Sequence, residues 1–91
     1  MIIYKYLLLE TTDIQHIEMP QGAILLHVDN QAERIYLWAL VDRERPSELR
    51  TIRIVGTGHE VEIEDTHHPK HIGSLLMLDG RFVWHVFEML K

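Results

Sequence analysis

The residues with the clearest capacity for chemistry form the run Gly56-Thr57-Gly58-His59. Glycines allow consecutive backbone N–H groups to point at one anion, as they do in phosphate-binding loops. The run lacks the Gly-Lys-Ser/Thr ending of a P-loop, and it lacks the third glycine and following helix of a dinucleotide-binding fingerprint. A tight hairpin turn needs the same glycines, because they reach positive φ without steric cost. The pattern favours a turn, and an exposed turn can also display a ligand contact.

A predicted ligand site extends from this run to two further residues. Arg53 precedes the run on the same predicted strand and supplies a positive charge. Trp38 lies in one of the most apolar strands, where core packing is the usual role and a stacking wall for a planar ligand is the alternative. The predicted ligand-binding residues are Arg53, Gly56, Thr57, Gly58, His59 and Trp38. A small anionic, nucleotide-like molecule suits these residue types.

Histidine is frequent, with seven in 91 residues. The run His67-His68-Pro69-Lys70-His71 contains an i, i+4 pair that could hold a metal ion on a helix. Pro69 interrupts such a helix, and Lys70 repels a cation. The run is therefore predicted to be a solvated loop, and neither a metal nor a cofactor is expected.

His85 is the one histidine with a candidate catalytic partner, because Ser74 is expected to face it across a hairpin. A serine hydrolase also needs an acid that orients the histidine, and no acid is predicted on that face. Glu60, Glu62 and Glu64 alternate along a predicted strand, which is typical of a solvated face and not of paired catalytic carboxylates. No catalytic residues are predicted, and the protein is not expected to be an enzyme.

The elements that position these residues are short strands, because the apolar residues alternate or form short runs rich in β-branched and aromatic types. Polar turn sequences separate the strands and favour antiparallel pairing of neighbours. The predicted strands are about 2–9, 13–18, 23–29, 34–41, 49–56, 59–64, 72–78 and 81–89. We predict an all-β fold in one domain, residues 1–91: a small antiparallel β-sandwich or barrel of about eight short strands in meander hairpins.

Two of these hairpins have a predicted register. Asp79-Gly80 is a strong two-residue turn signal in which both residues adopt positive φ. The pairs expected around it are Leu78 with Arg81, Met77 with Phe82, Leu75 with Trp84, Ser74 with His85 and Gly73 with Val86.

The second hairpin is predicted around the 56–59 turn. An even-numbered loop gives one apolar face and one charge-paired face, whereas a shift by one residue mixes the two faces. The pairs expected are Val55 with Glu60, Ile54 with Val61, Arg53 with Glu62, Ile52 with Ile63 and Thr51 with Glu64.

Composition limits the classes of partner. The net charge of −5 disfavours general nucleic-acid binding, and the arginines near Arg50 are interleaved with acidic residues. No apolar run approaches the roughly 20 residues of a membrane helix, and residues 1–9 resemble a strand more than a signal peptide.

The chain has no cysteine, so packing must stabilise it. Several of the predicted strands are apolar on both faces, which one thin sheet could not bury. The sequence therefore predicts either a closed two-layer fold or burial against a second copy of the chain, and a homo-oligomer is expected.

Several short motifs together resemble a family of small bacteriophage-encoded proteins of unassigned function. Among them are the stretches Leu-Trp-Ala-Leu-Val-Asp at 37–42, Ile-Val-Gly-Thr-Gly-His at 54–59 and His-Val-Phe-Glu at 85–88. The resemblance implies expression in the cytoplasm of an infected bacterial host and brings no catalytic residues. It suggests a non-enzymatic accessory protein that binds a host protein or sequesters a small anionic host defence signal. The alternative is a virion-associated or structural interaction module without a ligand site.

Overall fold

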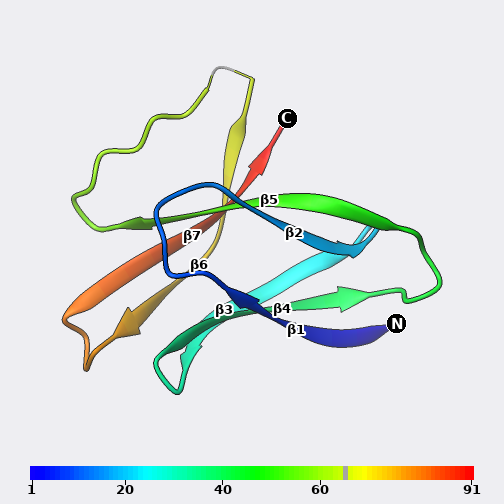
Figure 1. The fold of residues 1–91 in the computed structure, drawn as a ribbon, viewed down its shortest axis with the longest axis horizontal. Coiled ribbons are helices and arrows are strands. Elements are labelled where there is room, and N and C mark those ends of the chain that lie inside the picture. The colour runs from blue at the N-terminus through cyan, green and yellow to red at the C-terminus, as the bar shows by residue number, and fades with distance from the viewer. Residues whose placement is uncertain (65) are drawn as a thin grey trace.

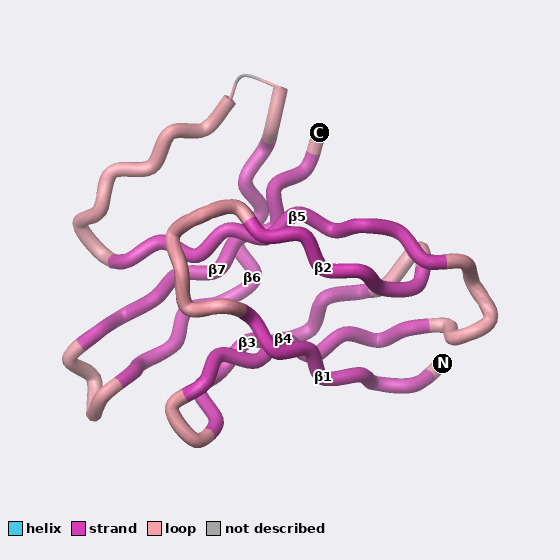
Figure 2. Tube along the Cα trace, viewed as in Figure 1, coloured by secondary structure: helices cyan, strands magenta, loops and turns pink. Residues whose placement is uncertain are grey.

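A computed structural model describes residues 1–64 and 66–91. Within these residues the chain forms seven strands and no helix (Figure 1). The loops that join them are pink in Figure 2, where the longest connection follows β5. The strands are β1 (Ile2–Leu8), β2 (Gln15–Pro20), β3 (Ile24–Gln31), β4 (Arg34–Val41), β5 (Ser47–Gly56), β6 (His68–Met77) and β7 (Phe82–Leu90).

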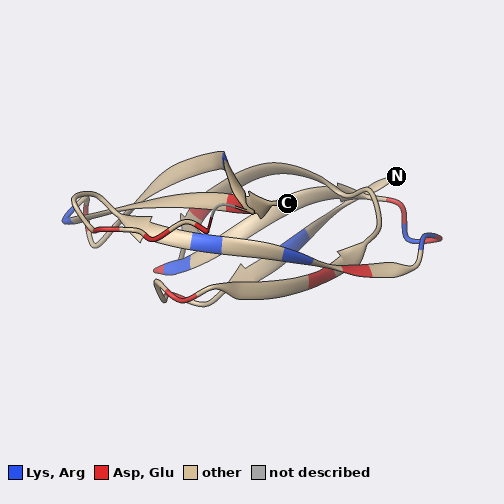
Figure 3. Cartoon of the chain, turned by 90° about the horizontal axis from the view of Figure 1, so that it is seen from above, with Lys and Arg blue, Asp and Glu red and all other residues tan. Residues whose placement is uncertain are grey.

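The strands form two antiparallel sheets that pack as a sandwich. Sheet A has the strand order β1-β4-β3, and sheet B has the order β2-β5-β7-β6. The molecule measures 40 × 35 × 16 Å, and Figure 3 shows it edge-on as a thin body. The predicted all-β antiparallel sandwich is confirmed, and the sheets do not close into a barrel.

Alternation along the strands builds the core between the two sheets. In β4 the residues Ile35, Leu37, Ala39 and Val41 are buried, while the residues between them face outward. Ile52 and Ile54 of β5 and Val86 of β7 meet them from sheet B. The period of two in these sequences therefore decides which face of each strand enters the core.

The order of the strands differs from a meander. Only β3–β4 and β6–β7 are hairpins of successive strands, whereas β1 pairs with β4, β2 with β5, and β5 with β7. In the C-terminal hairpin the predicted register is confirmed for the four pairs from Gly73–Val86 to Met77–Phe82. Leu78 and Arg81 lie in the turn itself, where Leu78, Asp79 and Gly80 all have positive φ.

The predicted strand at 59–64 and its hairpin with β5 are wrong. Both edges of β5 are already occupied, because β2 pairs with it from Ser47 to Ile52 and β7 pairs with it from Ile52 to Gly56. β2 takes the positions opposite Thr51 and Ile52 that were predicted for Glu64 and Ile63, and residues 59–64 form no ladder with the rest of that edge. The loop predicted at 67–71 is also wrong from His68 onward, because β6 begins at His68. Asp65 lies outside the described residues.

Polar side chains connect the two sheets at their margins. The Gln15 side chain accepts a hydrogen bond from Leu9 N (2.9 Å) and donates one to Leu9 O (3.0 Å). On the opposite margin, Asn30 Nδ2 of β3 donates to Leu76 O of β6 at 3.1 Å. β6 lies close to β3 here, because a Cβ on Gly73 would lie only 2.9 Å from a methyl group of Val28.

A buried ion pair makes the third connection between the sheets. The Arg50 guanidinium of β5 donates two hydrogen bonds to the Glu88 carboxylate of β7, and its Nη1 donates to Ala23 O at 2.8 Å. The Glu88 side chain is only 6% exposed. Its hydrogen bond raises the pKa of Arg50 above the ordinary value, outweighing the opposite effect of burial. Arg50 therefore stays charged and satisfies both Glu88 and a backbone carbonyl near the start of β3.

Replacing only one member of this pair should be strongly destabilising. Glu88→Ala leaves a buried guanidinium without its partner, and we expect a loss of about 3–5 kcal/mol in the free energy of unfolding. The double replacement Arg50→Met with Glu88→Leu removes both charges and should recover most of that loss. Urea denaturation measures both values, and a double variant as unstable as Glu88→Ala would contradict this account.

Candidate functional site

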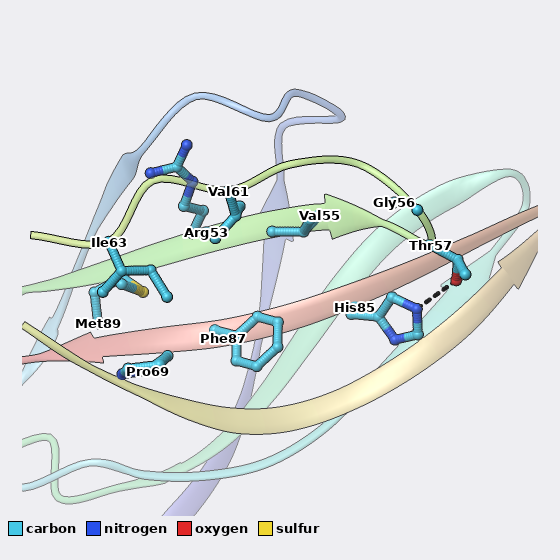
Figure 4. A pocket seen from close by; sticks show the side chains of 11 residues that line it. Arg53, Val55, Gly56, Thr57, Val61, Ile63, Pro69, His85, Phe87 and Met89 are labelled. Atoms are coloured by element: carbon cyan, nitrogen blue, oxygen red, sulfur yellow. Dashed lines mark hydrogen bonds between the residues drawn. The ribbon is translucent and has the colours of Figure 1, made fainter.

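The chain after β5 turns back over the outer face of sheet B. His59 N donates to Gly56 O at 3.1 Å, and Gly58 has a φ of +85°, so the predicted turn at 56–59 is present. The following residues run back along β5, on the side away from β7 in this view, without joining the sheet (Figure 4). We call residues 57–64 the covering segment. Arg53 Nη1 of β5 donates to Glu62 O at 3.0 Å and ties the covering segment to the sheet.

A cavity of about 330 Å³ lies between the covering segment and the sheet. Its floor is Val55 of β5 with Phe87 and Met89 of β7, and its roof includes Val61 and Ile63 (Figure 4). Met89 is buried although it lies outside the core cluster between the sheets. The outer face of sheet B therefore carries a second, smaller apolar region with an empty space in it. The other lining residues are Arg53, Gly56, Thr57, Gly58, Pro69 and His85.

One end of this cavity is polar, because His85 and Thr57 line it. Thr57 Oγ1 lies 2.6 Å from His85 Nε2 (Figure 4), and Ser74 Oγ lies 2.7 Å from His85 Nδ1. His71 Nε2 lies 3.0 Å from the same Ser74 oxygen. The four side chains form a hydrogen-bonded series that we call the His85 chain. It runs across the sheet from the end of β5 through β7 to β6.

The structure brings together most of the predicted ligand-binding residues. Gly56, Thr57, Gly58 and Arg53 all line the cavity. The Arg53 guanidinium is turned away from Phe87 (Figure 4), and among the described residues its buried Nε has no hydrogen-bond partner.

His59 lies on the other side of the turn. It lines a separate space of about 160 Å³ with Trp84, and its ring centroid is 6.1 Å from that of Trp84. The backbone N–H groups of Thr57 and His59 donate to Val83 O and Gly56 O. They are not free to cradle an anion.

Trp38 is not part of this site. It belongs to the outward row of β4 on sheet A, and its ring centroid lies 5.9 Å from that of His27 and 6.1 Å from that of Tyr36. The alternation of β4 gives Trp38 an outward position because Leu37 and Ala39 enter the core. That outer face is on the opposite side of the sandwich from the covering segment.

Two contacts of the His85 chain, those of Thr57 and His71, could not be predicted from the sequence. The Ser74–His85 contact follows from the predicted C-terminal register, but Thr57 and His71 join only because β5 pairs with β7 and because β6 contains a bulge after His71. The signal for a covered outer face was present in β7, where Val83, His85, Phe87 and Met89 alternate with core residues. A strand without charged residues on its outward side indicates a second covered surface.

Metal-ligand and membrane-spanning features are absent from the part of the chain that the structure describes. No group of three or more His, Asp or Glu residues is placed to hold a metal ion there. Glu64 Oε2 lies 3.6 Å from His67 Nδ1. No helix suited to crossing a membrane occurs in these residues.

Gly56 should be essential to the shape of the turn. A Cβ at this position would lie 2.7 Å from the His59 ring and 3.1 Å from Trp84. Gly56→Ala must therefore displace the His59 ring, and we expect a loss of about 1–3 kcal/mol in the free energy of unfolding. Combining it with His59→Ala should restore most of this loss, because the flexible obstacle is removed. Chemical denaturation measures the free energy of unfolding of each single variant and of the double variant. A loss in the double variant equal to the sum of the two single losses would contradict this explanation.

Comparison with known proteins gives a family for the chain. No curated protein and no solved structure shows significant similarity to it. One family model matches it over residues 1–91, and its description is domain of unknown function (DUF7352). Because this match covers the whole sequence, the chain belongs to the DUF7352 family.

Proposed function

We propose that this protein is a non-enzymatic binding protein that takes a small molecule into the cavity under the covering segment. The ligand has an apolar, planar body that fits between Phe87 and the covering segment. Its polar end contacts Thr57 and His85. The main support for this proposal is the apolar cavity of about 330 Å³, which has polar groups at one end. This arrangement is typical of small-molecule sites.

The covering segment supports this proposal because an unfilled apolar space beneath it lowers the stability of the folded protein. Val61 and Ile63 form the roof, yet they do not fill the space beneath them. Ile63 is still 41% exposed. A ligand body in the cavity would bury these side chains and Phe87 more completely, at roughly 25 cal/mol per Å² of apolar area.

The proposed biological role follows from the resemblance to short phage-encoded proteins. In the cytoplasm of an infected bacterium, a small protein with this cavity would act by sequestering a host signal. A planar base or ring would occupy the apolar space, and a negatively charged end would meet His85. No catalytic role is proposed for any residue.

Filling the cavity should abolish binding while preserving the fold. We expect Val61→Trp to occupy the space, because the added ring faces an existing void. Binding of 1-naphthoate, and of a panel of nucleoside monophosphates, is measured by calorimetry and by the shift in melting temperature. A ligand at about 100 times its Kd stabilises the native protein by about 2.7 kcal/mol, and this gain should disappear in Val61→Trp.

Leu49→Trp is the matched control, since Leu49 is 66% exposed and lies away from the cavity. It should bind the same ligands as the unmodified protein. Equal binding by both variants would place the ligand elsewhere, and no stabilisation by any member of the panel would remove the proposal.

A homo-oligomeric interaction module is the second candidate, and the outer face of sheet A favours it. Ile3 is 56% exposed and Ile24 is 53% exposed, and both pair with Leu40 of β4. An apolar row of this kind on a small domain marks a contact surface more often than a solvated one.

Light scattering after size-exclusion chromatography tests the oligomer. A second copy packed on this face should give a dimer, and Ile3→Glu with Ile24→Glu should convert it to a monomer by burying charge in the contact. Leu76→Glu, at an exposed position on β6, is the control and should leave the dimer intact. A monomer at every concentration would remove this candidate.

A further inference from the structure

The two sheets have four outer edges, and three of them carry features that hinder pairing with a further strand. β3 and β6 lie against each other, and the Asn30 side chain of β3 bonds to the β6 backbone. Each of these two strands also has a bulge. β2 carries Glu18 and ends at Pro20, which has no N–H donor. Bulges, charged side chains and proline are the means by which proteins protect sheet edges.

β1 has none of these protective features. It spans seven residues without a proline or an acidic residue, and it pairs with β4 at every position without a bulge. Within the described part of the chain no strand pairs with its other edge, which we call the free edge of β1. Ile2, Ile3 and Leu7 of this strand are exposed apolar residues. An edge of this kind is a template for pairing with another strand.

The single charge of β1 is turned away from the free edge. Lys5 is the only charged residue of the strand, and its Nζ donates to Gln31 Oε1 of β3 at 2.8 Å. The same Nζ lies 4.6 Å from the centre of the Tyr36 ring of β4. Because β4 and β3 lie on the paired side of β1, the lysine reaches across the sheet. It does not shield the backbone groups at the free edge.

We propose that the free edge of β1 pairs antiparallel with the same edge of a second copy of the chain. The two three-stranded sheets then join into one continuous sheet, with the two β1 strands at its centre. A twofold axis makes such a contact self-complementary, and main-chain hydrogen bonds supply its affinity. The proposal goes beyond the function proposed above, because it needs no ligand in the cavity and leaves the outer face of sheet A uncovered.

The charge of Lys5 limits the register of this pairing. Directly opposite residues of an antiparallel pair lie on the same face, so the twofold axis passes beside a residue that faces its own copy. An axis at Lys5 would oppose two like charges, which is destabilising. The end of β1 near Leu9 is covered, because the backbone N and O of Leu9 both bond to a side chain of β2. Tyr4 is the central position that remains for the axis.

With the axis at Tyr4, the directly opposite residues suit each other. On the inner face Tyr4 meets its own copy and Ile2 meets Tyr6, and aromatic and β-branched residues are stabilising cross-strand partners. On the outer face Ile3 meets Lys5, so no like charges are opposed. Tyr4 and Tyr6 already pack against the core, and their side chains therefore lose little further freedom when the strands pair.

Hydrogen exchange of the backbone amides measures this pairing directly. Alternate N–H groups of β1 point away from β4, and they should gain protection as the protein concentration rises from micromolar to millimolar. Light scattering over the same range should show a dimer. The amides of β2 that point away from β5 are the internal reference and should not change. A monomer throughout this range, or a dimer whose β1 amides stay unprotected, would overturn the proposal.

Charges at position 3 test the register, because the exposed Ile3 would face Lys5 of the second copy. Ile3→Lys opposes like charges twice in the dimer, and we expect association to weaken about tenfold. Ile3→Glu opposes unlike charges and should preserve or tighten the dimer. Combining Ile3→Lys with Lys5→Glu should restore association. An unchanged dimer in Ile3→Lys would contradict the register at Tyr4, and circular dichroism checks that each variant is folded.

The two possible dimers respond in opposite ways to Ile3→Glu. A dimer packed through the outer face of sheet A is weakened by this substitution, whereas pairing through the free edge of β1 survives it. Ile24→Glu, on the far strand β3, should likewise leave the edge-paired dimer intact. Loss of the dimer in both Ile3→Glu and Ile24→Glu would overturn the proposal in favour of packing through the face.

Discussion

The antiparallel ladder between β5 and β7 is the constraint on which the candidate site depends. Residues from Ile52 to Gly56 pair with residues from Glu88 to Trp84, while β2 occupies the other edge of β5. The chain that leaves β5 forms no ladder with the edge beside Arg53 to Gly56. It runs back along β5, and Val61 and Ile63 line the cavity together with Phe87 and Met89 of β7. The same ladder brings the end of β5, with Thr57, next to His85.

The two faces of this ladder differ in how completely their side chains are packed. On the inner face, Ile54 and Val86 complete the core, and the Arg50–Glu88 pair links β5, β7 and the start of β3. A buried, fully hydrogen-bonded ion pair adds specificity of register more than net stability. On the outer face, packing is incomplete, and a cavity is left beside the His85 chain.

The all-β class, the strand alternation and the C-terminal register could be predicted because each depends on local pattern or on a short turn. The position of residues 59–64 could not. Val61 and Ile63 alternate with glutamates, and this pattern is the same whether the segment pairs with β5 or lies over it. The choice depends on β7, which takes one edge of β5, and on β2, which takes part of the other; both strands are distant in sequence. For the same reason the sequence placed Trp38 with the turn, although β4 presents it on the far side of the sandwich.

The position of the covering segment decides where the cavity lies, and nuclear Overhauser contacts in solution can measure that position. We expect contacts between the methyl groups of Val61 and Ile63 and the ring of Phe87, because these side chains enclose the cavity. Backbone contacts of Ile54 should be with Val86. Cross-strand backbone contacts between Ile54 and Val61, with no contact between Val61 and Phe87, would show a β5 hairpin and contradict the account.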